Sequence, residues 1–433
     1  MTANDIKIRD NKKLGEKYYY FKHSSGLSVY VFPKELTSAY ALFGTKYGSI
    51  DNCFRIGKDS EFTRVPDGIA HFLEHKMFEN EDGEDLFEKF ARTGASANAY
   101  TSFMHTMYLF SCTENFKESL DILLRGVTSP YFTDENVAKE QGIIGQEIRM
   151  YEDNVHNALF FGMLKAMYAS SNVRTEIVGT IKSISQITPE ILYKCYNTFY
   201  NLNNMALCVC GNIDVNDVIS VCDDVLKVAP EIDIESVWAQ PKERESVVSD
   251  RFTRKMQVSK PIFSIGIKDI KISETAAERL KKRVIVETLT ECLFGQSSEF
   301  SASIYEEGVI RNPLSYYSEH NRAFSFIELS GESENPEEVL ERFKKYIEKM
   351  QDTRIDEQTF TRVLRSAYGA LIGIFDSVGS IANEFLSFIM EDYDIFDYIE
   401  MFEKITLNDV NSALKEMFKN EYYTLATIYP KDN

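Results

Sequence analysis

The feature that most constrains this chain is the pentapeptide His71-Phe72-Leu73-Glu74-His75, which has the pattern H-x-x-E-H. It contains two of the six histidines in the sequence. Positions i and i+4 of a helix lie on one face, so a helix here brings both imidazoles to one metal ion. Glu74 falls close to that face and can contact a water molecule without binding the metal. Two imidazoles, a carboxylate and a water are the groups that a hydrolytic zinc site requires.

A histidine pair of this kind also occurs on solvated helix surfaces, so a zinc site needs a third protein ligand from another segment. Glu140 and Glu147 are seven residues apart, which is two helical turns, so a helix places them on one face. Their neighbours are apolar, and charged groups on such a helix need partners. A metal with its surrounding hydrogen bonds supplies those partners, and a pair of acids on a wet helix face is the alternative.

Composition sets the size and the class of the protein. The chain has 433 residues with 44% hydrophobic content, which predicts two domains of about 200 residues each. Its formal net charge of −19 argues against nucleic acid as a partner. No secretory signal and no uninterrupted apolar stretch of membrane-spanning length is visible, so no membrane partner is expected. The seven cysteines are scattered and predict buried free thiols, which fits a reducing, cytoplasmic location.

Hydrophobic periodicity in the first half predicts a helix from Asp67 to Phe78, with Asp67 as its N-cap. Strands are expected over residues 27–32, 40–47 and 205–210, and residues 98–112 are expected to form one long strand or two short ones. Helices are expected over residues 115–124, 184–200 and 214–226, together with one long helical stretch from 133 to about 169.

The second half repeats this order approximately. Strands are expected over residues 261–267, 314–319, 323–330 and 422–428, and helices over 276–293, 300–307, 336–350, 356–375 and 380–390. The repetition predicts an α+β fold of two homologous α/β-sandwich domains, each a mixed sheet covered by helices, related by duplication. The predicted boundaries are 1–228 for the domain with the zinc site, 229–250 for a linker and 251–433 for the homologous domain. The second half has only one histidine, His320, so the metal site belongs to the first.

Taken together, these segments resemble the pitrilysin/insulinase family of zinc peptidases, and within it the bacterial members of the YmfH type. In that family H-x-x-E-H is followed after about 70 to 80 residues by a glutamate, commonly with another glutamate seven positions before it. By this resemblance His71, His75 and Glu147 bind one Zn²⁺ per chain. Glu74 is then the general base that activates water, and Glu140 is a carboxylate behind the ligands that orients the site.

The segments 94–101 and 106–108 resemble the family's Asn-Ala-x-Thr…Thr-x-Tyr sequence. The resemblance implies an edge strand to which the backbone of an extended substrate adds, with Asn98 and Ala99 in contact with the substrate. An ordinary sheet strand is the alternative. A structural or rim role is expected for His105 in the same strand.

The second half departs from the family pattern. Many members carry an arginine and a tyrosine, seven positions apart around a glycine, that bind the scissile region. Here Ile304 occupies the arginine position and Arg311 the tyrosine position, so the pair is absent. Tyr305, Arg311, Tyr316 or Tyr317 could replace it, and structural roles for these side chains are the alternative.

The resemblance implies a zinc-dependent endopeptidase that hydrolyses peptides or unfolded segments inside a closed chamber of four homologous domains. This chain supplies two domains, half of a clamshell, so a homodimer or a heterodimer with a homologue is implied. One alternative is a non-catalytic or weakly catalytic peptide-binding subunit of a heterodimer. Another is a peptidase that removes leader peptides from ribosomally made peptide products.

Overall fold

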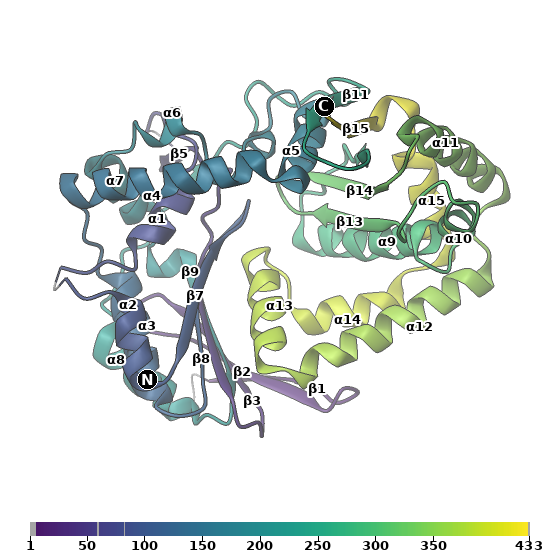
Figure 1. Ribbon diagram of the computed structural model, residues 1–433. Coiled ribbons are helices and arrows are strands. Elements are labelled where there is room, and N and C mark those ends of the chain that lie inside the picture. The colour runs from purple at the N-terminus through teal and green to yellow at the C-terminus, as the bar shows by residue number, and fades with distance from the viewer. Residues whose placement is uncertain (1–5, 59, 82, 432–433) are drawn as a thin grey trace. The chain divides into compact units, whose positions relative to one another are not determined.

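The computed structural model describes residues 6–58, 60–81 and 83–431, which form two compact units that interleave along the chain (Figure 1). The first unit consists of Met1–Ile148, Glu176–Trp238 and Ile372–Ile395. The second unit consists of Arg149–Thr175, Ala239–Leu371 and Phe396–Asn433.

The first unit is built on a seven-stranded sheet of order β1-β2-β3-β9-β4-β8-β7. Its strands are β1 (Lys7–Asn11), β2 (Glu16–Lys22), β3 (Ser28–Pro33), β4 (Ala39–Thr45), β7 (Ser96–Thr101), β8 (Thr106–Cys112) and β9 (Met205–Gly211). Neighbouring strands are antiparallel except β3 and β9, which run parallel. A small separate sheet has the order β10-β5-β6 and contains β5 (Cys53–Ile56), β6 (Thr63–Arg64) and β10 (Ile234–Ser236).

Helices cover both faces of the large sheet in the first unit. One face carries α2 (Leu86–Thr93), α3 (Phe116–Thr128) and α8 (Val215–Val225), and the other carries α13 (Val378–Met390) (Figure 1). The remaining helices of the unit are α1 (Ile69–Lys76), α4 (Asp134–Asp153), which runs five residues past the unit boundary, α6 (Ile181–Ile184) and α7 (Pro189–Phe199). Helix α1 contacts β7 and β8, which brings the H-x-x-E-H segment to one edge of the sheet.

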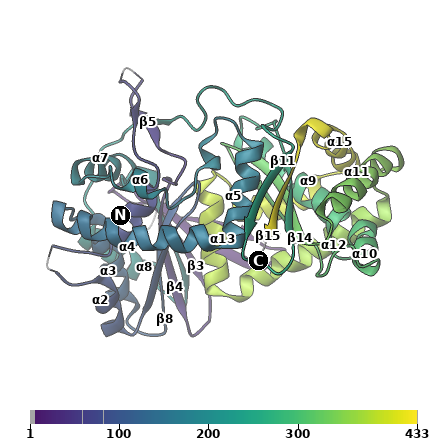
Figure 2. The same ribbon diagram turned by 45° about the horizontal axis from the view of Figure 1, so that its top comes forward.

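The second unit has a five-stranded sheet of order β11-β15-β12-β14-β13. Its strands are β11 (Arg251–Met256), β12 (Ile262–Lys268), β13 (Ser315–His320), β14 (Ser325–Glu332) and β15 (Tyr423–Pro430). Helix α5 (Val155–Met167) packs on β11, β12 and β15 (Figure 2). The other helices are α9 (Ala276–Phe294), α10 (Glu299–Glu306), α11 (Pro336–Thr353), α12 (Glu357–Gly373), α14 (Ile395–Lys404) and α15 (Leu407–Met417).

The two sheets share one topology, which confirms the predicted duplication. The order β3-β9-β4-β8-β7 matches β11-β15-β12-β14-β13, and in each the first pair is parallel and the others antiparallel. The third helix after the strand pair β7–β8 is α5, and the third after β13–β14 is α13. Each packs on the sheet formed by the other half of the sequence. The boundaries at residues 228 and 251 therefore stay a prediction about the repeated sequence, because the compact units interleave.

Several expected elements differ from the observed ones. The long helical stretch after residue 133 is broken at Asn154, whose side chain accepts a hydrogen bond from the backbone N–H of Asn157 and caps α5. Of the two alternatives for residues 98–112, the structure has the two short strands, the hairpin of β7 and β8, and His105 lies in its turn rather than in a strand. The sequence patterns did not predict β1 or β11, whose residues are largely polar or exposed, nor β2, which is rich in tyrosine and only partly buried.

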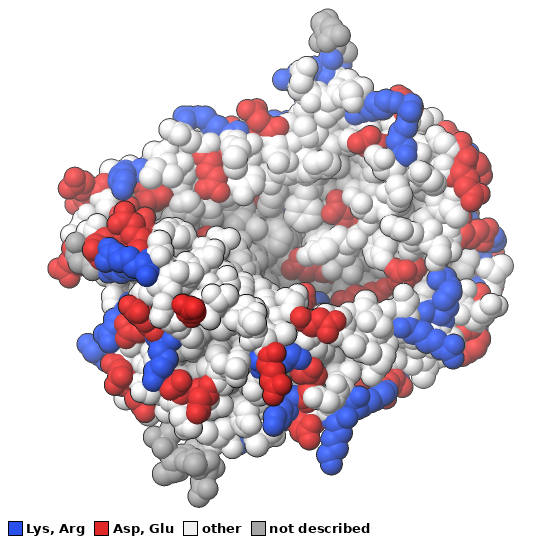
Figure 3. Space-filling model, turned by 60° about the horizontal axis from the view of Figure 1, so that its bottom comes forward, with Lys and Arg blue, Asp and Glu red and all other residues white. Residues whose placement is uncertain are grey.

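The cysteine prediction is confirmed, because all seven are free and buried. No single helix in the described part of the chain has the length and apolar character to cross a membrane, although one bent pair of consecutive helices, Glu357–Asp376 with Val378–Met390, passes the same test when taken together. On the face shown in Figure 3, lysine and arginine side chains lie interspersed among aspartate and glutamate.

Candidate metal centre

Helix α1, which carries the H-x-x-E-H segment, begins at a tight backbone contact. The expected span of Asp67 to Phe78 is too long, and Asp67 is not the N-cap. Gly68 takes that position with φ of 90°, in the left-handed region that glycine tolerates. A Cβ atom there would lie 2.7 Å from the carbonyl oxygen of Val178, so no larger residue fits. Asp67 instead accepts a hydrogen bond of 2.6 Å from Nδ2 of Asn52.

His71, His75 and Glu147, the ligand set that the family resemblance implied, converge from two helices. Each offers one ligand atom, and these three atoms lie within 4.8 Å of one another. Nε2 of His71 is 3.6 Å from Oε1 of Glu147, and Nε2 of His75 is 3.5 Å from Oε2. Tetrahedral zinc with bonds of about 2.0 to 2.2 Å separates its ligand atoms by about 3.3 to 3.6 Å. The donor types therefore fit zinc, and each imidazole lies at about this separation from one of the two oxygens of Glu147.

Neighbouring groups shift the pKa values of Glu147 and His75. The facing imidazole of His71 lowers the pKa of the Glu147 carboxyl, against a smaller opposing effect of burial. Burial by itself lowers the pKa of His75, but the hydrogen bond and charge of Glu140, together with the charges of Glu74 and Glu147, outweigh it and raise the pKa.

Glu140 lies directly behind one of the two imidazoles. Its Oε1 is 3.0 Å from Nδ1 of His75, and its side chain is only 6% exposed. A carboxylate on one ring nitrogen fixes the orientation of the imidazole and directs the other nitrogen to its partner. Glu140 thus lies behind His75, where the family resemblance implied an orienting carboxylate.

Glu74 lies on the same helix, with its carboxylate turned toward strand β7. Its Oε2 accepts a hydrogen bond of 2.6 Å from the hydroxyl of Thr101. Burial raises the pKa of Glu74, although His71 and Thr101 act in the opposite direction. A buried carboxylate beside two imidazoles has the location and the basicity that proton transfer requires.

Strand β7 lies at the edge of the seven-stranded sheet and pairs only with β8 among the described strands (Figure 1). The backbone N–H of Ala99 bonds to Oδ1 of Asn98 and not to β8. In an antiparallel pair the outward-facing residues alternate, so Ala97, Ala99 and Thr101 present their peptide groups to the free edge. The strand therefore offers a template to an extended peptide.

The four second-half candidates for the missing arginine and tyrosine behave differently from one another. Ile304 itself is 1% exposed within α10. Three candidates engage glutamates of their own unit: Arg311 pairs with Glu334, the hydroxyl of Tyr316 with Glu291, and the hydroxyl of Tyr317 with Glu319. Tyr305 is the fourth, and its side chain is exposed.

Sequence reasoning missed two contacts around the site. One is the Thr101 hydroxyl on Glu74. The other is Lys76, a fully buried lysine that pairs with Glu79 and lies 3.9 Å from Oε2 of Glu140. The signal for Lys76 was present, because it follows the H-x-x-E-H segment on a helix whose other residues are mostly apolar.

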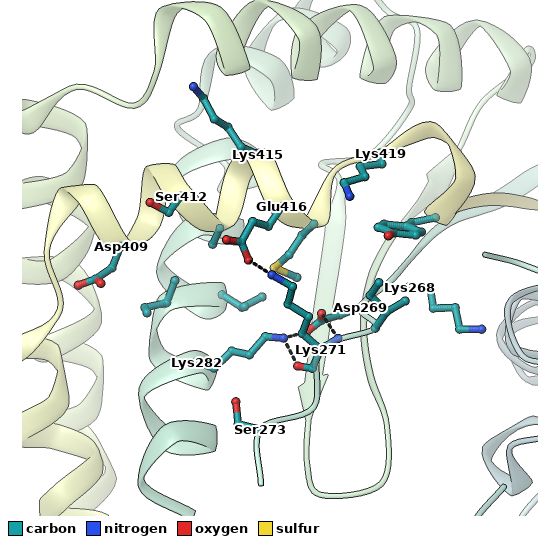
Figure 4. A pocket seen from close by; sticks show the side chains of 16 residues that line it. Lys268, Asp269, Lys271, Ser273, Lys282, Asp409, Ser412, Lys415, Glu416 and Lys419 are labelled. Carbon is teal, nitrogen blue, oxygen red and sulfur yellow. Dashed lines mark hydrogen bonds and ion pairs between the residues drawn. The ribbon is translucent and has the colours of Figure 1, made fainter. Parts of the chain in front are cut away.

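The second unit holds a separate cavity of about 510 Å³ between α9, α15 and the segment after β12 (Figure 4). Its lining is rich in lysine, but each of its carboxylates is paired. Asp269 pairs with Lys282, Glu416 with Lys271, and Asp409 with Lys281. The described residues that line this cavity do not include a histidine, so it differs in chemistry from the His-His-Glu cluster.

Comparison with known proteins supports the resemblance seen in the sequence. Residues 58–181 match the family model "Insulinase (Peptidase family M16)", and residues 186–366 match the model "Peptidase M16 inactive domain". The chain is 39% identical over 429 residues to YmfH, an uncharacterized zinc protease of Bacillus subtilis, covering 98% of this chain and 100% of the relative. It is 24% identical over 378 residues to YmxG, another uncharacterized zinc protease of that organism, covering 84% and 89%.

Solved structures agree on the fold. A crystal structure from Alicyclobacillus acidocaldarius, described as M16-like, matches with a TM-score of 0.92 and 30% identity over 96% of this chain and 99% of that one. Pitrilysin matches with a TM-score of 0.73 and 16% identity over 98% of this chain but only 46% of its own. With both family models and a relative matched along its whole length, the chain belongs to the insulinase family, peptidase family M16.

Proposed function

We propose that this protein is a zinc-dependent endopeptidase that hydrolyses peptides or unfolded segments. The observation that carries the proposal is the convergence of His71, His75 and Glu147, with the Glu74 carboxylate on the same helix face. Family membership supports it, since several relatives are named as zinc proteases. The family match and the relatives named as zinc proteases make the chain zinc-protease-like, whatever the roles of its individual residues.

Zinc is the metal that the donor set fits, at one ion per chain, because two imidazoles and one carboxylate leave a fourth position open. Zinc bound there polarises the peptide carbonyl and makes water a stronger acid. His71, His75 and Glu147 would hold the ion. Glu140 keeps the imidazole of His75 in the orientation that directs Nε2 toward it.

The role proposed for Glu74 is proton transfer. Its carboxylate takes a proton from the attacking water, whose oxygen forms a bond to the carbonyl carbon of the peptide. The carbon–nitrogen bond then breaks, and Glu74 passes the proton to the departing amine. The products are a carboxylic acid, which then releases its proton to the surroundings and becomes a carboxylate, and an amine, and Glu74 returns to its starting state.

The free edge of β7 is the proposed substrate-binding surface. An extended peptide that pairs with Ala99 gains backbone hydrogen bonds without any requirement on its side chains. Asn98, whose amide oxygen now accepts from the N–H of Ala99, would release that N–H to the substrate. Backbone recognition of this kind selects extended or unfolded segments over folded proteins.

A chamber built from two chains is part of the proposal. The match covers 98% of this chain but only 46% of pitrilysin, so the pitrilysin polypeptide is roughly twice as long as this chain. We infer a homodimer, or a heterodimer with a homologous subunit, that completes the same set of domains. The seven buried free thiols support a reducing, cytoplasmic location for it. Sedimentation equilibrium of the purified protein, alone and with a homologous subunit, tests the assembly.

The decisive experiment compares wild type with Glu74→Gln and with a surface control, Glu88→Gln. Zinc per chain is measured first, and cleavage of a quenched peptide library second. About one zinc per chain is expected in all three proteins, with hydrolysis reduced by at least about 100-fold in Glu74→Gln alone. Equal hydrolysis by wild type and Glu74→Gln would remove Glu74 from the mechanism.

A second candidate function is a peptide-binding subunit with little or no activity of its own. The observation that favours it is the replacement of the arginine and tyrosine pair by Ile304 and Arg311. Wild-type protein that binds peptide but neither holds zinc nor cleaves the library would support this function instead.

A further inference from the structure

One hydroxyl connects the proposed substrate strand to the proposed base. Thr101 is the last residue of β7, and its Oγ1 donates to Oε2 of Glu74 at 2.6 Å. Among the residues that the structure describes, no side chain or backbone group bonds to the other carboxylate oxygen, Oε1. The two oxygens of Glu74 are therefore not equivalent.

The hydroxyl of Thr101 also lies beside a second hydroxyl. Oγ1 of Thr106, on the neighbouring strand β8, lies 3.2 Å from it. Thr106 donates its own proton to the carbonyl oxygen of Tyr47 at 2.9 Å. Because an ionised carboxylate can only accept, the proton between Thr101 and Glu74 is that of the Thr101 hydroxyl, so this hydrogen bond runs in one direction only.

The backbone of Thr101 faces a different partner from its side chain. By the alternation of antiparallel pairing, its peptide group points to the free edge of β7, as that of Ala99 does. A peptide that extends the sheet would therefore pair with Thr101 while the hydroxyl of the same residue holds Glu74. Thr101 would thus take part both in binding the peptide and in orienting Glu74.

We propose that Thr101 is a positioning residue, which both orients the Glu74 carboxylate and aligns the bound peptide. This proposal rests on the proposed function. The Thr101 hydroxyl fixes Oε2 of Glu74 and leaves Oε1 to take the proton, while the peptide group of the same residue aligns the substrate strand. Misplacing a catalytic group by a fraction of a bond length costs rate but not affinity. Removing the Thr101 hydroxyl should therefore lower kcat and leave KM unchanged.

The test compares Thr101→Val, which keeps the shape and loses the hydroxyl, with Thr101→Ser, which keeps the hydroxyl. Thr101→Ala is a second variant without the hydroxyl, and Thr253→Val on the exposed surface of β11 is the matched control. Loss of the hydrogen bond should lower kcat by about 10- to 100-fold in the valine and alanine variants. KM should stay unchanged, and Thr101→Ser should restore most of the activity.

Two readouts do not depend on turnover. Zinc per chain should equal that of wild type in every variant, because Thr101 touches no ligand. Peptide affinity, measured in the Glu74→Gln background, should be the same with and without Thr101→Val. Loss of zinc or of peptide affinity would make Thr101 a structural residue and overturn the inference.

The failure of this inference differs from the failure of the proposed function. Wild type that binds zinc and cleaves peptides, beside Thr101→Val that cleaves them equally well, overturns the inference alone. A serine variant as slow as the valine variant does the same. Wild type without zinc or hydrolysis overturns both.

Discussion

Nδ1 of His75 lies 3.0 Å from Oε1 of Glu140, while Nε2 of the same ring lies 3.5 Å from Oε2 of Glu147. One imidazole is thus held between two carboxylates that lie two turns apart on α4. The seven-residue spacing of those glutamates equals two helical turns, so a single rigid helix sets both distances. The orientation of His75, on α1, therefore depends on two carboxylates fixed by the helix α4 and not on a flexible loop.

The first prediction concerns this arrangement. Glu140→Gln keeps the size of the side chain but replaces a charged acceptor of the Nδ1 proton with a neutral one. Zinc affinity should fall by about 10- to 100-fold, as is usual when a carboxylate behind a histidine ligand is removed. Competition with a chromophoric chelator at fixed pH measures the change. Glu135→Gln, on the exposed face of the same helix, is the control, and equal affinity of both variants would contradict the role of Glu140.

Much of this site could be predicted from sequence because helical spacing converts directly into geometry. His71 and His75 at i and i+4, and Glu140 and Glu147 at i and i+7, fix which side chains share a face. The contact of Thr101 with Glu74 could not be predicted this way. It joins a helix to a strand, and their relative placement depends on packing that no local pattern encodes.

The second prediction concerns the helix that the two halves exchange. Phe385 on α13 is fully buried, and its ring lies 4.7 to 5.0 Å from the rings of Tyr18, Tyr30 and Phe32 on the first sheet. Phe385→Ala should lower the free energy of unfolding by about 3 to 5 kcal/mol, because it leaves a cavity in an aromatic cluster.

Hydrogen exchange locates that effect. Protection should fall in β3 and β9, although the substitution lies more than 170 positions after the end of β9 along the chain. Phe62→Ala, at a 42% exposed position, serves as the control and should change stability little. Loss of protection confined to the second unit would contradict the packing of α13 on the first sheet.

Helix exchange also shows where sequence patterns stop being informative about the fold. Periodicity predicted a helix over residues 380–390 with an apolar face, and α13 (Val378–Met390) agrees closely. The pattern says that the face must be covered, but not by which sheet. The same holds for α5, which the sequence placed in a continuous helical stretch with α4. Its cap at Asn154 and its contacts with β12 and β15 are tertiary features.

The third prediction concerns acid stability. Burial alone raises the pKa of Glu243, but backbone N–H groups of Ala169, Ser170 and Ser171 and the ammonium of Lys268 lower it to about 2. A carboxyl whose folded pKa lies below its unfolded value of 4.5 stabilises the protein above pH 4.5 and loses that contribution as the pH falls toward 2. The full contribution is about 3 kcal/mol for a side chain that is mostly buried.

Urea unfolding of Glu243→Gln and wild type measures this contribution. The difference in unfolding free energy between the two proteins should be largest near neutral pH. It should shrink as the pH falls below 4.5 toward about 3, because Glu243 of the unfolded wild type then binds a proton that the folded protein still excludes. Glu245→Gln, two residues away and exposed, should follow wild type throughout. A gap that is independent of pH would show that the Glu243→Gln variant is destabilised for steric rather than electrostatic reasons.

The last prediction uses proline to separate the two sides of strand β7. At Ala99 the N–H faces the free edge, so Ala99→Pro leaves the ladder to β8 intact, as edge strands permit. At Asn98 the alternation places the N–H on β8, so Asn98→Pro removes a ladder hydrogen bond. The same substitution at adjacent positions should therefore have opposite consequences. Ala99→Pro should keep thermal stability and zinc binding but weaken peptide affinity, whereas Asn98→Pro should lower stability first. Fluorescence anisotropy of a labelled peptide in the Glu74→Gln background measures affinity without cleavage, and calorimetry measures stability. If Ala99→Pro binds peptide as tightly as its parent, the peptide does not add to this edge, and the substrate must be recognised by another surface.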